Sequence, residues 1–348
     1  MKRFHIPITI LSLLLLPSLT WPQSNCTPAP VSYSITDLGT LGGVSSFAKA
    51  INNSGSVTGW GPTAAGDSHP FLWTSSTGMQ DLGSLGGPIA IGEGINSTGY
   101  VVGYAYLPTF NIHAFLWTPT TGIQDLGSLS GPNGTSFAVG IDDLNRIVGN
   151  TSTPSNQNGG DAAIWTGASI FDLGTNGAVT AQFDAINSKF EVAGRIDFVS
   201  TTVAVQWTRK GGFKTLPSLF AGDSTLAFAL NNHETIAGED FNPTTRFSTA
   251  VAWIRGTVKG LGSLGGGANA LGVNDECQIV GYSFLPDNLT THAFLWTPPG
   301  GMQDLNNLIP INSGWVLEDA DGINTTGQIA GTGLINGQTH AFLLTPTS

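Results

Sequence analysis

The chain has 348 residues, of which 10% are charged and 47 are glycine, and its formal charge is −11. Typical domains are about 25% charged and about 7% glycine, so this composition indicates an extracellular β protein with many turns. The 12 Lys and Arg residues form no basic cluster, which argues against nucleic acid and anionic membrane surfaces as partners.

Residues 1–24 have the layout of a secretory signal peptide. Lys2 and Arg3 precede an apolar run over 6–19, which is too short to cross a bilayer. We therefore predict a signal peptide over 1–24, an N-terminal tail over 25–32 and secretion. The extracellular space is the expected location, with the periplasm and the cell surface as alternatives. No later stretch is apolar and long enough to span a membrane, and a monomer is expected.

Three sequence markers then recur seven times, about 44 residues apart. The first is a Trp in segments such as "HAFLW", at Trp73, Trp117, Trp165, Trp207, Trp253 and Trp296, with Leu344 in the seventh copy. The second is an Asx after an aliphatic residue, at Asn52, Asn96, Asp142, Asn187, Asn231, Asn274 and Asn324. The third is a Gly in segments such as "SVTGW", at Gly59, Gly103, Gly149, Gly194, Gly238, Gly281 and Gly331.

Each copy predicts four short strands. A strand of small residues ("FAKAIN") runs into an Asx turn, and a "SVTGW" strand follows it. A variable loop leads to the "HAFLW" strand, and a short turn leads to "MQDLGSL". Gly55, Gly99, Asn145 and Gly327 suit a positive-φ position in the Asx turn, whereas Phe190, Glu234 and Cys277 fit it less well.

Four strands in 40 to 45 residues is the period of a propeller blade, so residues 33–348 predict an all-β, seven-bladed propeller. An open β-solenoid is the alternative, but it would use a shorter repeat. The chain starts with a fourth-type strand at 33–43 and ends after a third-type strand at 340–348. These two should pair and close the ring, burying Ile35, Leu38 and Leu41.

The repeated words "HAFLW…DLGSLGG…IN..G..VG" resemble the bacterial HAF-repeat family of extracellular proteins. The tripeptide that names the family stands at His113, His292 and His340. The resemblance covers residues 33–348 and is weaker where "VAVQW" and "TAVAW" lack the His. It implies a secreted repeat protein, and it supplies no catalytic residues.

The repeated His residues are predicted to be structural. His69, His113, His292 and His340 share one blade position, so they are dispersed around the ring rather than gathered into a site. They are expected to bond neighbouring backbone, and Trp73, Trp117 and Trp296 to pack between blades. The recurring carboxylates are interpreted as hydrogen-bonding groups in turns: Asp37, Asp81, Asp125, Asp172 and Asp304.

No complete catalytic or metal motif is present, and no cofactor is predicted. His233 and Glu234 begin an H-E-x-x-H pattern, but Ala237 replaces its second His. The segment "EDADG" at 318–322 carries part of a calcium-loop pattern. It predicts either Ca²⁺ near Asp319 and Asp321 or an exposed acidic loop.

The two cysteines, Cys26 and Cys277, are placed by the repeat on one face of adjacent blades, so we predict a disulfide between them. A lipid anchor on Cys26 is the alternative. Residues 23–25 lack the small side chains that such processing needs.

The best candidate site is the central channel, which the first strand of each blade should line. One variable position of that strand holds Lys49, Glu93, Val139, Asp184, Phe228, Leu271 and Asp321. Charges there should face the channel, because burying them between blades would be costly. The segment 309–320 is predicted to be a loop that adds Trp315, Glu318 and Asp319 on the face of the variable loops.

Two functions are compatible with this sequence. The first is a secreted, non-catalytic binding or scaffolding module for an extracellular glycan or protein. The second is a secreted hydrolase or lyase that uses channel acids such as Glu93, Asp184 and Asp321, since glycosidase chemistry needs paired carboxylates.

Overall fold

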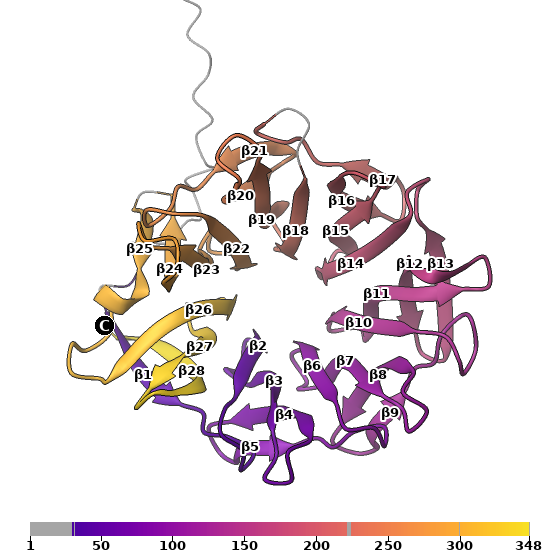
Figure 1. Cartoon of the computed structure of the whole chain (residues 1–348), viewed down its shortest axis with the longest axis horizontal. Helices are drawn as coiled ribbons and strands as arrows, with labels where there is room; N and C mark the ends of the chain where they lie inside the picture. The colour runs from indigo at the N-terminus through magenta and orange to yellow at the C-terminus, as the bar shows by residue number, and fades with distance from the viewer. Residues whose placement is uncertain (1–29, 31, 221–223, 299, 348) are drawn as a thin grey trace, which may run out of the picture.

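The computed structural model describes residues 30, 32–220, 224–298 and 300–347 (Figure 1). These residues form seven four-stranded antiparallel sheets around a common axis, which confirms the seven-bladed propeller. The predicted signal peptide and Cys26 lie outside the described residues. Within the described part of the chain, no helix has the length and apolarity needed to cross a membrane.

The blades follow the chain, and each is given from its innermost strand outward. Blade 1 holds β2 (Phe47–Ile51), β3 (Val57–Pro62), β4 (Ser68–Thr74) and β5 (Gly78–Asp81). Blade 2 holds β6 (Ala90–Ile95), β7 (Val101–Tyr106), β8 (Ile112–Thr118) and β9 (Gly122–Asp125). Blade 3 holds β10 (Ser136–Ile141), β11 (Arg146–Thr153), β12 (Asn156–Thr166) and β13 (Ser169–Gly174). Blade 4 holds β14 (Thr180–Ile186), β15 (Glu191–Asp197), β16 (Thr202–Thr208) and β17 (Gly212–Thr215).

Blade 5 holds β18 (Thr225–Leu230), β19 (Thr235–Asn242), β20 (Phe247–Ile254) and β21 (Thr257–Gly260). Blade 6 holds β22 (Ala268–Val273), β23 (Ile279–Phe284), β24 (Thr291–Thr297) and β25 (Gly301–Asp304), after which comes a short 3-10 turn, η1 (Leu305–Asn307). Blade 7 holds β26 (Trp315–Ile323), β27 (Ile329–Ile335), β28 (Gln338–Thr347) and, from the start of the chain, β1 (Ser32–Asp37).

The ring closes as predicted, with β1 antiparallel to β28 and Ile35 opposite Leu344. Leu38 is buried, while Ile35 and Leu41 are partly buried. Tyr33, which the sequence analysis did not single out, is only 1% exposed and packs in the core of blade 7. The closing strand and the residue after it therefore contribute Tyr33, Ile35 and Leu38 to the hydrophobic clusters of the ring closure.

The repeated Trp packs between blades, as predicted. Trp73 contacts a cluster that includes Ala330 and Ala341 of blade 7, and Trp296 packs with Ala237 and Ala250 of blade 5. The alanines leave room on each blade for the aromatic ring of the next. Burial of one such ring contributes a few kcal/mol to stability.

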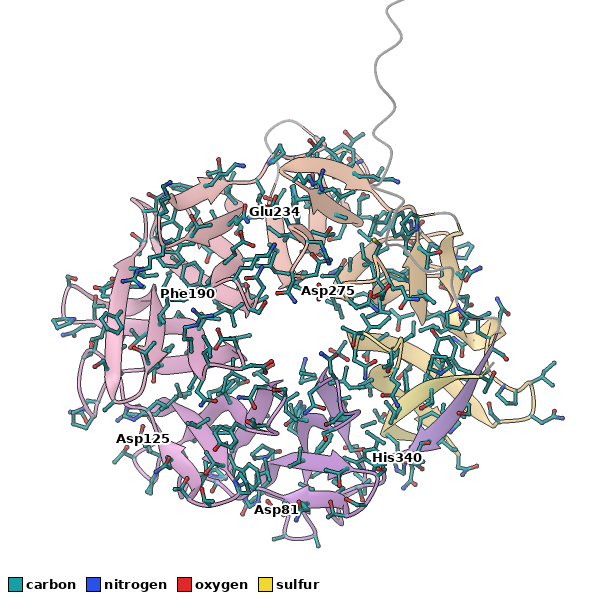
Figure 2. The ribbon with its side chains drawn as sticks, turned by 180° about the vertical axis from the view of Figure 1, so that it is seen from behind. Asp81, Asp125, Phe190, Glu234, Asp275 and His340 are labelled. Carbon is teal, nitrogen blue, oxygen red and sulfur yellow. The ribbon has the colours of Figure 1, made fainter. Side chains whose placement is uncertain are left out.

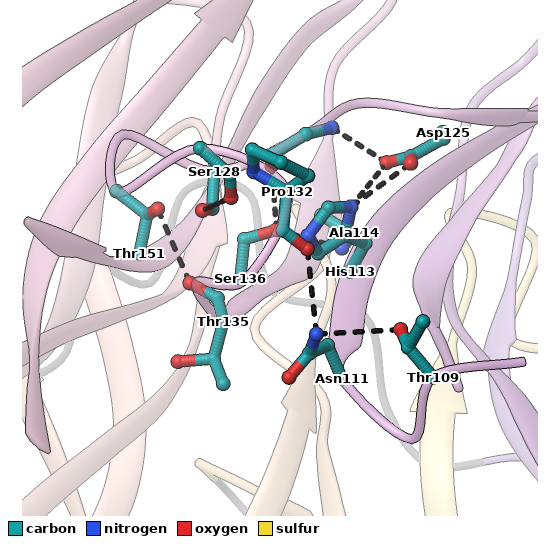
Figure 3. A network of polar contacts seen from close by, with 12 residues as sticks. Thr109, Asn111, His113, Ala114, Asp125, Ser128, Pro132, Thr135, Ser136 and Thr151 are labelled. Carbon is teal, nitrogen blue, oxygen red and sulfur yellow. Dashed lines mark hydrogen bonds and ion pairs between the residues drawn. The ribbon is translucent and has the colours of Figure 1, made fainter. Parts of the chain in front are cut away.

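A hydroxyl at the start of the inner strand joins adjacent blades. Ser136 Oγ accepts the Ala114 N–H at 2.8 Å and donates to the Gly127 carbonyl at 2.6 Å (Figure 3). Ser46 forms the same pair of bonds across the ring closure, with the Ala341 N–H and the Gly39 carbonyl. These bonds satisfy backbone groups that the blade edges would otherwise leave unpaired.

The Asx turns form a hydrogen-bonded belt around the channel. In each turn the Asx Oδ1 accepts backbone N–H groups two and four residues ahead; Asn52, for example, binds Ser54 and Ser56 at 3.1 and 2.9 Å. In six blades the side-chain amide donates to the carbonyl of the next Asx: Asn52 to Asn96, Asn96 to Asp142, Asn187 to Asn231, Asn231 to Asn274, Asn274 to Asn324 and Asn324 to Asn52.

Blade 3 departs from this belt because Asp142 has no amide to donate. Arg146 forms an ion pair with Asp142 and donates to the Ser188 carbonyl of blade 4 at 3.3 Å instead. Its guanidinium also lies 4.1 Å from the ring centre of Phe190. Phe190, Glu234 and Cys277 do take positive φ, at 62°, 61° and 62°, so the turn imposes this conformation even on unfavourable residues.

The two ends of the ring differ, and we name them by their connections. The turn face carries the turns between first and second strands and between third and fourth strands. The loop face carries the connections between second and third strands and those between blades. Backbone bonds tie the two kinds of loop together: the Gly87 N–H donates to Tyr106 and the Gly266 N–H to Phe284. Two of the variable loops are short, because β11 and β12 leave only residues 154–155 between them, and β19 and β20 only residues 243–246.

Candidate functional site: a chamber in the central channel

The inner strands have a bulge at the same place in every blade. In β2 the pairing with β3 passes from Ala48 directly to Ala50, which leaves Lys49 unpaired. The residues skipped in the seven blades are Lys49, Glu93, Val139, Asp184, Phe228, Leu271 and Asp321. These are the residues of the predicted variable position. A bulge of this kind re-aims a side chain without ending the strand, so it explains how each blade presents a residue of its own to the axis.

All seven bulge residues line one cavity of about 510 Å³ in the channel. The prediction that Lys49, Glu93, Asp184 and Asp321 face the channel is therefore confirmed. Toward the turn face, the cavity meets a ring of one aliphatic residue per blade: Ile51, Ile95, Ile141, Ile186, Leu230, Val273 and Ile323. Beyond that ring lies a second hollow of about 260 Å³, lined by the Asx turns. We call the first cavity the chamber.

One side of the chamber holds a charged cluster from blades 7, 1 and 2. Lys49 Nζ lies 3.7 Å from Asp321 Oδ1, and the charge of Asp321 raises the pKa of Lys49 despite its burial. Burial, followed by the neighbouring charge of Asp319, raises the pKa of Asp321 well above its usual value. Burial also raises the pKa of Glu93, which Lys49 only partly offsets. The carboxylates here are thus incompletely neutralised by the one Lys.

The opposite side holds Asp184 in a fixed network. Its carboxylate accepts from Gln182 Nε2 at 2.6 Å and from the Arg195 guanidinium at 3.4 Å. Its side chain is only 8% exposed, and burial raises the pKa of Asp184 to about 6, although Arg195 opposes this. Asp184 therefore borders the chamber, as predicted for this position, but its carboxylate is held by Gln182 and Arg195.

Two residues that sequence reasoning missed, Tyr104 and Asn150, also line the chamber. They belong to the position after the repeated Gly of the second strand, on the loop-face side of the bulge, and we call this position the mouth. Most blades differ there: Trp60, Tyr104, Asn150, Arg195, Glu239, Tyr282 and Thr332. Trp60 stacks on Phe47 with ring centres 4.4 Å apart, and Tyr104 meets Phe137 edge-on at 5.0 Å. These residues could have been found in the sequence, because their position varies between the repeats while the Gly before it is present in all seven.

The segment around Trp315 differs from its prediction. It is not a loop: β26 begins at Trp315, and both Glu318 and Asp319 lie in that strand. Trp315 is buried against Phe342, with ring centres 5.9 Å apart, so it belongs to the core of blade 7 and not to an exposed loop. A second bulge skips Glu318, and its pKa is raised by partial burial and by Asp319.

The calcium hypothesis rested on the same predicted loop. Asp319 instead accepts the backbone N–H of Thr332 at 2.9 Å, across the sheet. Asp321 pairs with Lys49. Among the described residues, no group of three or more His, Cys, Asp and Glu side chains is arranged to hold a metal ion.

The repeated His residues bond carboxylates rather than backbone, which corrects the prediction for them. His69, His113, His292 and His340 place Nδ1 at 2.8, 2.8, 2.7 and 2.9 Å from Asp81, Asp125, Asp304 and Asp37. Each Asp also accepts the backbone N–H two residues ahead, as Asp125 does from Gly127 at 2.7 Å. Asp81, Asp125 and His340 lie at separate places on three neighbouring blades (Figure 2), and Figure 3 shows the His113–Asp125 pair. The pairs join third and fourth strands and are structural.

Cys277 lies in the turn between β22 and β23 and is 7% exposed. No cysteine in the described part of the chain is free. Its expected partner, Cys26, is outside the described residues, so the disulfide between them stays a prediction.

Comparison with known proteins supports the fold. No family model and no curated protein matches this chain. Among solved structures, virginiamycin B lyase from Staphylococcus aureus is similar, with a TM-score of 0.59 and 12% identity over 90% of this chain and 99% of that one. A streptogramin B lyase gives 0.56 and 11% over 91% and 100%, and TolB from Acinetobacter baumannii gives 0.50 and 11% over 72% and 63%. At such identities the similarity shows the propeller fold alone.

Proposed function

We propose that this chain is a secreted, non-catalytic binding propeller that takes up part of an extracellular ligand in the chamber from the loop face. The observation that carries this proposal is the bulge repeated in all seven inner strands. It directs seven side chains, most of them different, into one cavity of about 510 Å³. A rigid repeated frame with variable residues at one point is the usual arrangement of a recognition site.

Two of the chamber acids already have polar partners, which favours binding over catalysis. Asp184 is held by Gln182 and Arg195, and Asp321 is held by Lys49. Aromatic rings such as Trp60 and Tyr104 stand at the mouth, where they offer contact area to a ligand. Secretion rests on the pattern of residues 1–24, and membership of the HAF-repeat family rests on the repeated words; both remain part of the proposal.

A hydrolase or lyase is the second candidate, because one observation favours it. Burial raises the pKa of Asp184 to about 6 and that of Asp321 well above its usual value. Carboxylic acids whose pKa is raised toward neutral pH are candidates for general acid catalysis.

The experiment is a screen of the mature protein against a glycan array and a displayed random-peptide library, with a reducing-sugar release assay on the same glycans. We expect binding without release, and binding at least tenfold weaker for Glu93→Gln. The matched control is Leu144→Ser, an exposed residue of the turn face. Sugar release that is lost in Asp184→Asn would favour the second candidate. Binders that ignore Glu93→Gln would contradict the chamber as the site.

A further inference from the structure

Exposed apolar side chains are concentrated on the loop face. Fourteen large apolar side chains among the described residues are exposed, and only Leu144 and Phe171 lie away from the loop face. The most exposed of the remaining twelve are Val44, Phe110, Val179, Val199, Leu289 and Ile311. They lie in loop-face connections of different blades, so they are distributed around the axis on this one face. Apolar groups gathered on one face mark an interaction surface, whereas scattered ones do not.

The connections of the loop face carry few charges, although the strand ends on this face hold Asp37, Asp81 and Asp125, with side chains 39%, 45% and 40% exposed. The connections carry only three charged residues in the described part of the chain, Asp67, Arg246 and Asp287. The shorter turns of the turn face carry nine: Asp142, Asp143, Lys189, Arg209, Lys210, Glu234, Arg255, Asp275 and Glu276.

The centre of this face is the exception, because the chamber and its mouth are acidic. The described residues there include five acids, Glu93, Asp184, Glu239, Asp319 and Asp321, and two cations, Lys49 and Arg195. Both cations already pair with carboxylates. Glu93 forms no hydrogen bond or salt bridge with any described residue, although it lines the chamber.

We propose that the loop face docks a protein partner whose apolar surface covers the exposed side chains and whose Lys or Arg side chain enters the chamber beside Glu93. This inference rests on the chamber being the binding site and adds the class of partner. The desolvated carboxylate gains a counter-charge, and the aromatic rings at the mouth can contact the cation.

Charge complementarity selects this occupant over two others. A second copy would bring its own acidic chamber against the first, and Arg246 is the only described basic residue in its loop-face connections. An anionic membrane would be repelled by the chamber and by the net charge of −11. A partner with a basic group amid apolar residues is complementary both to the acidic chamber and to the exposed apolar side chains around it.

The test begins with panning of a random twelve-residue peptide library on the mature protein, and one enriched peptide is then synthesised. We expect enriched peptides to contain Lys or Arg between apolar residues. Replacing that residue by norleucine should weaken binding at least tenfold in fluorescence anisotropy. In the protein, Glu93→Gln and the triple variant Val199→Ser/Leu289→Ser/Ile311→Ser should each weaken binding at least tenfold, with Leu144→Ser unchanged.

Three results would overturn the inference. One is enrichment of peptides without a basic residue, and another is equal binding of the norleucine peptide. The third is concentration-dependent dimerisation in analytical ultracentrifugation that the triple variant abolishes, since this would identify a second copy as the occupant. The proposed function is tested separately. If neutral glycans bind and their binding depends on Glu93, the chamber is still a binding site, but the inference of a basic protein partner is wrong.

Discussion

The two faces of this propeller are built from the same repeat but use it differently. On the turn face, Asx side chains repeat almost without change and join blade to blade in a hydrogen-bonded belt. On the loop face, the residues that follow the repeated Gly differ in most blades. The difference teaches that repeated residues in this chain hold the ring together, while departures from the repeat gather around the chamber, where we propose that a ligand binds.

The largest expected effect comes from breaking the ring where the two ends of the chain meet. Deleting residues 32–43 removes Tyr33, Ile35 and Leu38, which at about 1.5–3 kcal/mol each contribute roughly 5–9 kcal/mol. This is comparable to the whole stability of a typical domain, about 5–15 kcal/mol, so the protein should unfold or aggregate. Thermal melting followed by circular dichroism checks this.

A circular permutant provides the control for that deletion. Ser32 lies opposite Thr347 in the closing sheet, so a short linker can join the ends, with new termini opened between Thr153 and Asn156. This permutant should fold and melt cooperatively. A deletion mutant that melted at the parent temperature would show that β1 does not close the ring.

The next effect concerns the belt of the turn face. Asn274 Nδ2 donates to the Asn324 carbonyl at 2.8 Å, and Asn274→Asp removes that donor while keeping the acceptor. Leaving a buried carbonyl without a donor costs about 1–3 kcal/mol, which urea denaturation can measure. Asn53→Asp, in an exposed position of an equivalent turn, should change stability by less than about 0.5 kcal/mol. Equal losses of unfolding free energy in both variants would show that the belt contributes no more to stability than an exposed turn residue does.

The chamber should make stability depend on pH through Asp184. Its pKa is raised in the folded state to about 6 from an ordinary 3.8, so its protonation favours folding below pH 3.8 and this stabilisation is lost as the pH rises through 6. The Asp184→Asn variant lacks this loss. Its free energy of unfolding should therefore rise relative to wild type by about 2–3 kcal/mol between pH 4 and pH 7. A constant difference between the two proteins over that range would mean that Asp184 is not buried.

The smallest effect on stability is expected for the apolar residues of the loop face. Val199→Ser and Ile311→Ser replace side chains that are almost fully exposed, so the free energy of unfolding should change by less than about 0.5 kcal/mol. Chemical denaturation checks this. A loss of more than about 1 kcal/mol from either variant would assign these residues to folding and weaken the case for a docking surface.

The sequence sufficed for the architecture because each repeat carries its own boundaries. The Trp, Asx and Gly markers gave the blade number, the closing strand and the packing between blades, and Lys49, Glu93, Asp184 and Asp321 were placed at the channel correctly. Such features depend on the period alone, and the period is visible in one chain.

The features that could not be predicted from the sequence depend on how the strands pair. A bulge leaves no mark in a strand of alanines and glycines, so the reason why Lys49 or Asp184 faces the axis appeared only in the register. The His69–Asp81 bond joins neighbouring strands twelve residues apart in the sequence, and either residue could have met the backbone instead. Trp315 was misplaced because strand β26 is longer than its counterparts and begins where a loop was expected.

The most direct test of the central claim, that the loop face and its chamber form the binding site, is hydrogen–deuterium exchange with and without a ligand found by the screen. We predict added protection in the loop-face connections and in the inner strands around Lys49, Glu93 and Asp321. The Asx turns of the turn face should exchange at unchanged rates. Protection confined to the turn face, with none around the chamber, would contradict the account.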